Sequence, residues 1–474
     1  AFKAVSRFWD RITHPAQILQ SLPSALATLL DPADCGPAFI GLPQDVQGWT
    51  YDYPASFFDE KVHRIRRQSA DADEIIEAIA LLESAERPMI IAGGGVQYSG
   101  AVEELTAFAE SHAIPVVETI AGRANLKHDH PLNIGPIGVT GSDSANAIAQ
   151  DADVILAVGT RLQDFTTGSW TAFAKDAKII GVNVGRHDAA KHMSMTVVGD
   201  AKLALTDLAQ AGEGYLAPND WTKRAKTERV KWDAYVAENT RVGNGPASYA
   251  QAIGVVNELC DPRDRIVAAA GGLPAEVTAN WKTLDIGTVD VEFGFSCMGY
   301  EIAGGWGARI AQAQIEPDRD TIVFTGDGSY MLMNSDVYSS VLTDKKLIIL
   351  VLDNGGFAVI NKLQNNTGNE SFNNLIADTP TATRQVSVDF EAHARAMGAE
   401  AETVEMSGLA EAFKRAKASD KTYVICAKVD PYEGWTTEGH TWWEVGTPHV
   451  TTNPKVQAAH VDQEATRDRQ RKGV

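Results

Sequence analysis

The chain has 474 residues, 44% of them hydrophobic and 22% charged, which is ordinary for a globular protein with several packed cores. Its 42 basic and 62 acidic residues give a formal net charge of −20, which disfavours nucleic acid as a partner because phosphates are also anionic. No run of about 18 apolar residues occurs, so neither a transmembrane helix nor a membrane partner is expected. Four widely spaced cysteines argue against a disulfide framework or a zinc site and favour a cytoplasmic location.

Residues 1–70 show one helix and one strand, followed by a connecting segment. Pro15 suits a first helical turn, and apolar residues at helical spacing predict a helix over 14–30. The apolar run over 37–43 predicts a buried strand that ends at a proline. A single helix and strand cannot enclose a core, so we expect this block to be the end of an α/β domain whose front precedes Ala1.

Residues 71–212 alternate between segments with helical periodicity and short apolar segments typical of strands, as in a doubly wound α/β domain with a parallel sheet. The pattern predicts helices over 74–82, 102–109 and 142–150, and strands over 88–92, 115–117, 154–159 and 178–182. The first strand runs into Gly93-Gly94-Gly95. This turn is either a cradle for a nucleotide phosphate or a tight structural turn, and a lone glycine turn does not decide between them.

The polar residues 213–246, with a helix predicted over 221–238, are expected to link this domain to a second α/β unit over 247–474. That unit has predicted helices over 247–260, 299–313, 331–342 and 357–364, and strands over 265–269, 321–325 and 347–353. The last ten residues carry several basic side chains and are expected to form a solvated tail: Arg467, Arg469, Arg471 and Lys472.

The most informative segment is Gly326-Asp327-Gly328-Ser329, which follows the apolar strand 321–325 and precedes a helix. Glycine lets the backbone approach a ligand closely, and a helix start supplies free N–H groups for an anion. A carboxylate beside such a turn makes chemical sense when a divalent cation lies between it and a phosphate. The segment therefore indicates a phosphate site completed by Mg²⁺.

The next strand, 347–353, ends at Asn354-Gly355-Gly356-Phe357. Consecutive parallel strands place their carboxyl ends at one edge of a sheet, where open α/β sheets bind ligands. The Asn354 side-chain oxygen and the Gly356 carbonyl would then join Asp327 as Mg²⁺ ligands. The alternative interpretation is two ordinary turns in which Asp327 and Asn354 cap helices.

The pairing of Gly-Asp-Gly with an asparagine 27 residues after the aspartate, across one helix and one strand, resembles the thiamine-diphosphate enzymes. The turn 293–301 resembles that family's glycine-rich turn, which implies that Met298 props the cofactor into a bent shape and that the Ser296 carbonyl accepts from its pyrimidine ring. The loop 270–274 resembles another diphosphate-contacting loop. The implied cofactor-binding residues are Gly271, Gly272, Leu273, Ser296, Met298, Gly326, Asp327, Gly328, Ser329, Asn354, Gly356 and Phe357, with Asp327, Asn354 and Gly356 on the metal.

The order of the blocks resembles the acetolactate-synthase-like branch of that family. It implies a remnant of a pyrimidine-binding domain and a connector over 1–70, a central domain over 71–212, a linker over 213–246, and the diphosphate- and Mg²⁺-binding domain over 247–474. It also implies a homodimer or homotetramer. Some relatives hold a flavin in the central domain, but no flavin motif is evident, so FAD is not expected.

Within this branch the sequence is most similar to the dione hydrolases of myo-inositol catabolism. The matching stretches are 42–48, 138–141, 165–167, 292–301, 353–357 and 442–446. The resemblance implies hydrolytic cleavage of a carbon–carbon bond in trihydroxycyclohexane-1,2-dione, giving 5-deoxyglucuronate. The loop 365–385 departs from the hydrolase pattern, which puts the substrate contacts there in doubt.

The glutamate that activates the cofactor in this family is expected before Ala1, so no catalytic residue is assigned within the sequence. Five residues are candidates for a substrate pocket or lid, with packing or surface roles equally open: Phe357, Asn361, Gln364, His440 and Trp442. Two alternatives remain. One is another enzyme of the branch, a 2-oxo-acid ligase or decarboxylase, and the other is a chain that binds the cofactor without turnover.

Overall fold

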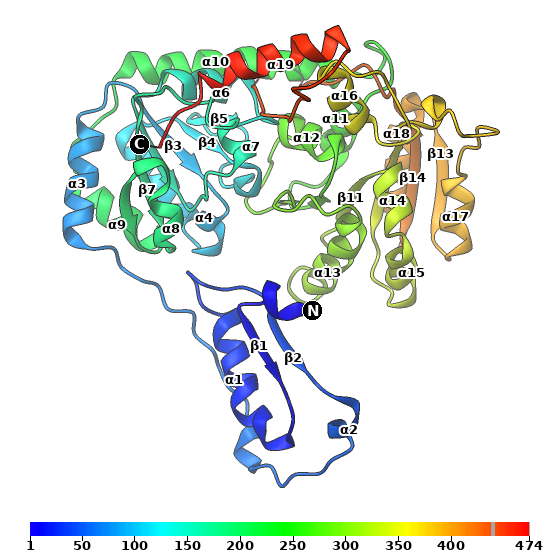
Figure 1. Cartoon of the computed structure of the whole chain (residues 1–474), viewed down its shortest axis with the longest axis horizontal. Helices are drawn as coiled ribbons and strands as arrows, with labels where there is room; N and C mark the ends of the chain where they lie inside the picture. Colours follow the sequence, from blue (N-terminus) through cyan, green and yellow to red (C-terminus); the bar gives the residue numbers. More distant parts are fainter. Residues whose placement is uncertain (438–440, 474) are drawn as a thin grey trace.

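The computed structural model describes residues 1–437 and 441–473. The chain forms a small N-terminal unit and two larger α/β domains, each built on a six-stranded parallel sheet (Figure 1). Both large sheets therefore have the doubly wound parallel architecture that the alternating pattern predicts. No helix in the described residues is both long and apolar enough to cross a bilayer.

The N-terminal unit is built on two parallel strands and one longer helix, β1 (Phe8–Arg11), β2 (Ala38–Gly41) and α1 (Ile18–Leu29), with the short helix α2 (Gln44–Gln47) after β2. Sequence reasoning anticipated the helix and β2 but not β1. The unit projects from the two large domains, and an extended connector leads from it to the central domain (Figure 1). It has almost no core of its own, because its buried residues are only Ile12, Pro15, Ser21, Ala25 and Val46.

The central domain carries strands in the order β5-β4-β3-β6-β7-β8. They are β3 (Pro88–Ala92), β4 (Val116–Glu118), β5 (Asn133–Pro136), β6 (Val154–Val158), β7 (Lys178–Asn183) and β8 (Met195–Val198). One face packs against helices α3 (Ala72–Glu83), α5 (Val102–His112) and α9 (Ala201–Ala211), and the other against α6 (Asp143–Asp151). The continuous apolar strands fit a sheet that is covered on both faces.

The glycines after β3 are required by packing. A Cβ on Gly93 would lie 2.3 Å from the Gly159 carbonyl oxygen, and one on Gly95 would lie 2.7 Å from the Gly159 Cα. The turns after β3 and β6 therefore pass each other too closely for side chains, which supports the structural interpretation of this turn. Gly94 and Gly95 also line a cavity of about 1170 Å³, so a phosphate-binding role stays a prediction.

The segment 213–246, expected as a linker, contains the helix α10 (Asn219–Asn239), which packs along α6 of the central domain. The Trp221 indole is buried and donates to the Pro88 carbonyl over 2.8 Å. At the domain boundary, the buried Arg123 pairs with Glu118 and donates to the Trp281 carbonyl over 2.7 Å. The Arg123 bond joins the central domain to the segment that follows α12 (Gly272–Asn280), and the Trp221 bond joins α10 to the central sheet.

The C-terminal domain carries strands in the order β10-β9-β11-β12-β14-β13. They are β9 (Arg265–Ala268), β10 (Val289–Val291), β11 (Thr321–Gly326), β12 (Ile348–Asp353), β13 (Glu400–Val404) and β14 (Tyr423–Lys428). The helices α11 (Tyr249–Leu259), α12 and α18 (Leu409–Ala418) cover one face. The other face is covered by α13 (Tyr300–Ile315), α15 (Ser335–Leu342) and α17 (Phe390–Ala396), while α14 (Asp327–Leu332) and α16 (Ala358–Asn366) follow β11 and β12.

The residues after β14 return to the central domain and end in α19 (Pro454–Arg467), which lies above both domains in Figure 1. The Trp443 indole donates to Asp164 over 2.6 Å. The prediction of a solvated tail is wrong for Arg471, whose backbone N–H donates to the Trp170 carbonyl and whose guanidinium bonds the Lys175 carbonyl. The positive charge alone predicted exposure to solvent, but backbone carbonyls of the central domain accept the hydrogen bonds that Arg471 donates.

Candidate functional site

Four loops meet at the carboxyl edge of the C-terminal sheet. They follow β9, β10, β11 and β12, which are adjacent parallel strands in the order β10-β9-β11-β12. The strand β10 lies on one side of β9, and β11, the next strand along the chain, lies on the other side. This reversal of strand order makes the edge a topological switch point, where open α/β sheets bind ligands. The loops contain the predicted cofactor residues around 270–273, 296–298, 326–329 and 354–357.

Asp327 begins α14 and is buried, with 6% of its surface exposed. Burial, together with the nearby Asp353 carboxylate, raises the pKa of Asp327 to about 7. Hydrogen bonding from the backbone of Gly328, Asn354 and Gly356 acts against that rise, which shows that the loops after β11 and β12 converge on this carboxyl group. A divalent cation here would offset both the desolvation and the repulsion between the carboxylates.

Asn354 follows β12 and is also buried. Its Nδ2 donates to the Tyr249 hydroxyl over 2.5 Å, while its Oδ1 has no hydrogen-bond partner within the described part of the chain. A buried acceptor without a partner costs free energy unless a ligand satisfies it. The residues therefore fit Mg²⁺, which prefers hard oxygen ligands and leaves positions for phosphate and water. Within the described residues, no three His, Cys, Asp or Glu side chains form an alternative metal cluster.

The glycines of these loops leave room for a ligand. A Cβ on Gly326 or Gly355 would meet no atom within 4 Å, so both face open space. Gly271 has a φ of +91°, and its Cβ would meet only Val359 at 3.9 Å. Gly356 differs, because a Cβ there would lie 2.3 Å from the Asn374 carbonyl oxygen, where the loop 369–378 crosses. The first three positions could admit a diphosphate, whereas Gly356 is required by packing of the chain.

Met298 and Phe357 both approach Gly328. A Cβ on Gly328 would lie 2.6 Å from the Phe357 ring and 3.6 Å from the Met298 methyl group. Met298 is partly exposed in a turn where Ser296 has a φ of +55°, whereas Leu273 is buried in the core beneath α12. Met298 and Ser296 are thus available to a ligand, and the Leu273 side chain serves packing.

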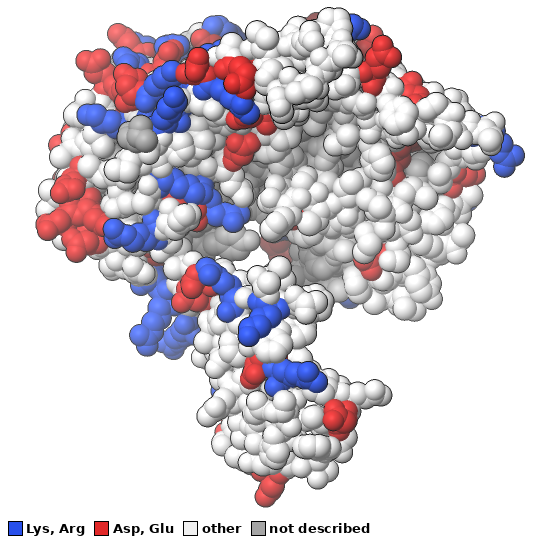
Figure 2. Space-filling view, viewed as in Figure 1, with Lys and Arg blue, Asp and Glu red and all other residues white. Residues whose placement is uncertain are grey.

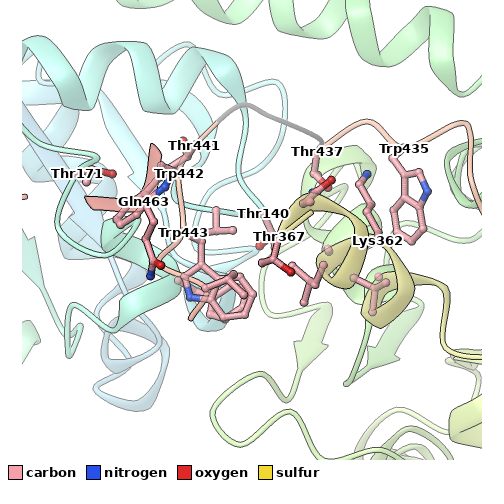
Figure 3. A pocket seen from close by; sticks show the side chains of 18 of the residues that line it. Thr140, Thr171, Lys362, Thr367, Trp435, Thr437, Thr441, Trp442, Trp443 and Gln463 are labelled. Carbon is pink, nitrogen blue, oxygen red and sulfur yellow. The ribbon is translucent and has the colours of Figure 1, made fainter. Parts of the chain in front are cut away.

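A cavity of about 980 Å³ lies between the two large domains and reaches the loops at Gly271, Gly272 and Ser296. Figure 3 shows side chains from both domains around it. Lys362 and Thr367 come from α16 and the residue after it, Thr140 and Thr171 from the central domain, and the remaining labelled residues from the returning C-terminal segment. Asp327 and Asn354 are not part of its lining. The cavity therefore adjoins the diphosphate loops and is separate from the metal ligands.

The five candidate pocket or lid residues fall in different places. Trp442 lines the cavity, and Asn361 is buried on α16. Gln364 bonds Asn374 and the Glu370 carbonyl, so it holds the loop that follows its own helix. Phe357 contacts the glycine turn, and His440 lies outside the described residues.

Sequence reasoning missed three residues at this site. Tyr249 orients Asn354, and Trp435 packs against the diphosphate loop, since a Cβ on Gly272 would meet its ring at 2.2 Å. Both come from segments far from the motifs, so no local signal marks them. Glu301, inside the turn 293–301, is the third, and its acidic character in a glycine-rich segment was the available signal.

Family models match both large domains. Residues 75–208 match the central domain of thiamine pyrophosphate enzymes, and residues 246–427 match their C-terminal TPP binding domain. The chain belongs to the thiamine pyrophosphate enzyme family. Thiamine pyrophosphate and thiamine diphosphate are the same compound, and the four loops lie within the second matched region.

Individual members of the thiamine pyrophosphate enzyme family match nearly the whole chain. A protein of Geobacillus thermodenitrificans named 3D-(3,5/4)-trihydroxycyclohexane-1,2-dione hydrolase is 37% identical over 97% of this chain and 75% of its own length. Proteins of that name from Bacillus licheniformis, and from Bacillus cereus with the suffix 2, are 36% and 35% identical over 97% of this chain. This chain covers 75% of the length of the Bacillus licheniformis protein and 76% of the length of the Bacillus cereus protein.

The Tyr249 contact leads to a first prediction. We expect Tyr249→Phe to weaken Mg²⁺-dependent binding of thiamine diphosphate by roughly 10- to 100-fold, the usual effect of removing a group that orients a metal ligand. The phenyl ring keeps the packing against Trp435, so the fold is retained. Calorimetric titration with and without Mg²⁺ measures the change. Unaltered affinity would show that Asn354 is positioned without Tyr249.

The Asp327 pKa leads to a second prediction, made for metal-free protein in EDTA. A folded-state pKa of about 7, above the ordinary value of 3.8, means that the folded state keeps a proton that the unfolded chain loses. Ionisation of Asp327 therefore lowers stability as pH rises from about 4 to about 7. We expect the stability advantage of Asp327→Asn over the wild type, measured by urea unfolding, to grow across this window. A difference independent of pH would contradict the shift.

Proposed function

We propose that this protein hydrolyses a carbon–carbon bond of trihydroxycyclohexane-1,2-dione to give 5-deoxyglucuronate in inositol catabolism, with thiamine diphosphate anchored through Mg²⁺. The observation that carries the proposal is the similarity to proteins named for this hydrolase activity over 97% of the chain. The switch-point loops and the buried Asp327 and Asn354 support the cofactor arrangement.

The chain's own residues would hold the cofactor and exclude water. Asp327, the Asn354 side-chain oxygen and the Gly356 carbonyl would ligate Mg²⁺, and the turns at Gly271 and Gly326 would admit the diphosphate. When bound, thiamine diphosphate supplies a nucleophilic carbon and an electron sink for cleavage beside a carbonyl. Met298 and Phe357 lie where apolar side chains would limit access of water to the turn at Gly328.

The cavity between the domains suits a small polyhydroxylated ring. Its lining combines hydroxyl, amide and ammonium groups with indole rings: Thr140, Thr437, Gln463, Lys362, Trp435 and Trp442. The Lys362 ammonium lies 4.6 Å from the centre of the Trp435 ring, beside the diphosphate loop. Polar groups at fixed positions on an aromatic wall are typical of sites that orient small polar substrates.

The direct test is incubation of the protein with thiamine diphosphate, Mg²⁺ and the cyclic dione, followed by proton NMR of the products. Formation of the open-chain acid would support the proposal. Release of CO₂ from pyruvate, with no reaction of the dione, would favour a 2-oxo-acid ligase or decarboxylase. Cofactor binding with turnover of neither substrate would favour the third alternative, a chain that binds without catalysis.

We also propose that copies of the chain associate as a homodimer or homotetramer through α13, α14 and α15. These helices, and the residue that follows α14, expose large apolar side chains: Ile315, Met331, Leu332, Met333, Tyr338 and Leu342. In Figure 2 the face around α13 and α15 carries few charged side chains. Exposed apolar side chains gathered on helices that follow one another in the chain are typical of an interface, and α14 begins at the cofactor turn at Asp327. Sedimentation analysis tests the assembly, and a monomer at micromolar concentration would contradict it.

The remaining expectations stay proposals. We propose the division into 1–70, 71–212, 213–246 and 247–474, and the matched regions 75–208 and 246–427 support the second and fourth parts. A cytoplasmic location is supported by four cysteines that are all free thiols in the structure. Fractionation of cells that express the protein tests the location.

A further inference from the structure

A buried acidic side chain connects the cofactor loops to one another. Glu301, in the first turn of α13, is 1% exposed. Its Oε1 accepts the Ala270 backbone N–H over 3.3 Å, and its Oε2 accepts the Gly299 backbone N–H over 2.8 Å. Burial raises the pKa of Glu301, and hydrogen bonding from the Ser329 side chain acts against that rise. One carboxyl group thus bonds the loop after β9 and the turn after β10, and it lies close to the Ser329 side chain at the start of α14.

These three segments hold most of the residues expected to contact the cofactor. Ala270 precedes the Gly271-Gly272 turn, Gly299 follows Met298, and Ser329 is two residues after Asp327. We propose that Glu301 is a positioning residue that sets the spacing of these three loops, so that the diphosphate site is formed before the cofactor arrives. The inference rests on the proposed cofactor-binding function.

The position of Glu301 separates this positioning role from catalysis. Glu301 does not line the 980 Å³ cavity, so it acts through the loops that it bonds. Its two oxygens satisfy two buried N–H groups that would otherwise lose their hydrogen bonds to water without compensation. Loops held in this way bind a ligand without first losing conformational freedom, which strengthens binding.

The test compares Glu301→Ala and Glu301→Gln with Gln312→Ala. The glutamine variant keeps one acceptor oxygen and presents its NH₂ group to the second N–H. Gln312 is a matched control, because it is a buried polar residue on the same helix and accepts from Thr321 at the opposite end of β11. Urea unfolding of all three variants checks that each is folded.

Two readouts are needed. Calorimetry measures thiamine-diphosphate affinity in Mg²⁺, and hydrogen exchange measures the Ala270 and Gly299 amides in cofactor-free protein. We expect Glu301→Ala to weaken affinity by roughly 10- to 100-fold and Glu301→Gln by about tenfold or less. Both loop amides should exchange at least about tenfold faster in Glu301→Ala. In turnover, the concentration of cofactor for half activity should rise, while kcat at saturating cofactor stays within about threefold.

Each outcome decides a different point. Wild-type affinity and unchanged amide exchange in folded Glu301→Ala would overturn the inference, as would an equal loss of affinity in Gln312→Ala. If the alanine variant does not fold, the glutamine variant and its two loop amides carry the decision. Failure of the wild type itself to bind thiamine diphosphate in Mg²⁺ would contradict the proposed function, while the exchange data would still decide whether Glu301 holds the loops.

Discussion

Asp327→Ala is expected to abolish Mg²⁺-dependent binding of thiamine diphosphate, with affinity falling by more than about a hundredfold. Asp327 is the carboxylate on which the loops after β11 and β12 converge, and without it the remaining proposed ligands of the cation are neutral oxygens. Removing a group that only orients a ligand costs about 10- to 100-fold, so removing the charged ligand itself should cost more. Calorimetric titration with and without Mg²⁺ measures the loss.

Two variants complete the Asp327 experiment. Asp336→Ala removes a carboxylate from α15 of the same domain, where it accepts from Ser339, and should leave cofactor affinity unchanged. Asp327→Asn should bind as poorly as the alanine variant, yet raise the urea midpoint of the metal-free protein at about pH 8, because it removes a buried charge. Retained binding in Asp327→Ala would remove the metal site from the proposal.

Arg123→Ala is expected to lower the free energy of unfolding by about 3–5 kcal/mol, because it leaves the buried Glu118 carboxylate without its cation. Arg123 and Glu118 are 4% and 0% exposed in their side chains. The substitution also removes the bond to the Trp281 carbonyl across the domain boundary. Urea unfolding followed by circular dichroism measures the change, with tryptophan fluorescence as a second probe for separate transitions of the two domains.

The control is an exposed ion pair of the same chemistry. Arg263 and Asp261 are 53% and 46% exposed, and Arg263→Ala should cost less than about 1 kcal/mol. The double variant Glu118→Gln/Arg123→Met removes both charges at similar volume and should recover part of the loss. A loss in Arg123→Ala as small as in Arg263→Ala would show that the buried pair contributes little to stability.

The metal-site geometry could be predicted because it depends on strand order. Strands 321–325 and 347–353 are strongly apolar and consecutive, and β11 and β12 are indeed parallel neighbours with loops at one edge. Tyr249 could not be predicted, since it lies 105 residues before Asn354 and reaches it only through the packing of α11. Glu301 was visible in the turn 293–301, but its bonds depend on how three loops fold together.

Some of the elements that sequence reasoning missed lack a clear periodic pattern, whereas α9 and α18 bury apolar residues at helical spacing and could have been predicted. β5 is a four-residue strand that contains glycine and proline, and β13 is a half-exposed edge strand with two glutamates. α12 is buried on all sides, so it has no polar face to reveal a helical period. β14 is apolar and buried, and it follows a loop-rich stretch in which no motif drew attention to it.

The contact between Trp443 and Asp164 joins residues 279 positions apart, which has a consequence for biosynthesis. At about 5–20 residues per second, the central domain leaves the ribosome roughly 15–55 seconds before the segment that completes one wall of its cavity. During that interval Phe165, which packs against Trp443, is without this covering ring. The nascent central domain would thus expose more of the Phe165 ring until the C-terminal segment has been synthesised and has packed against it.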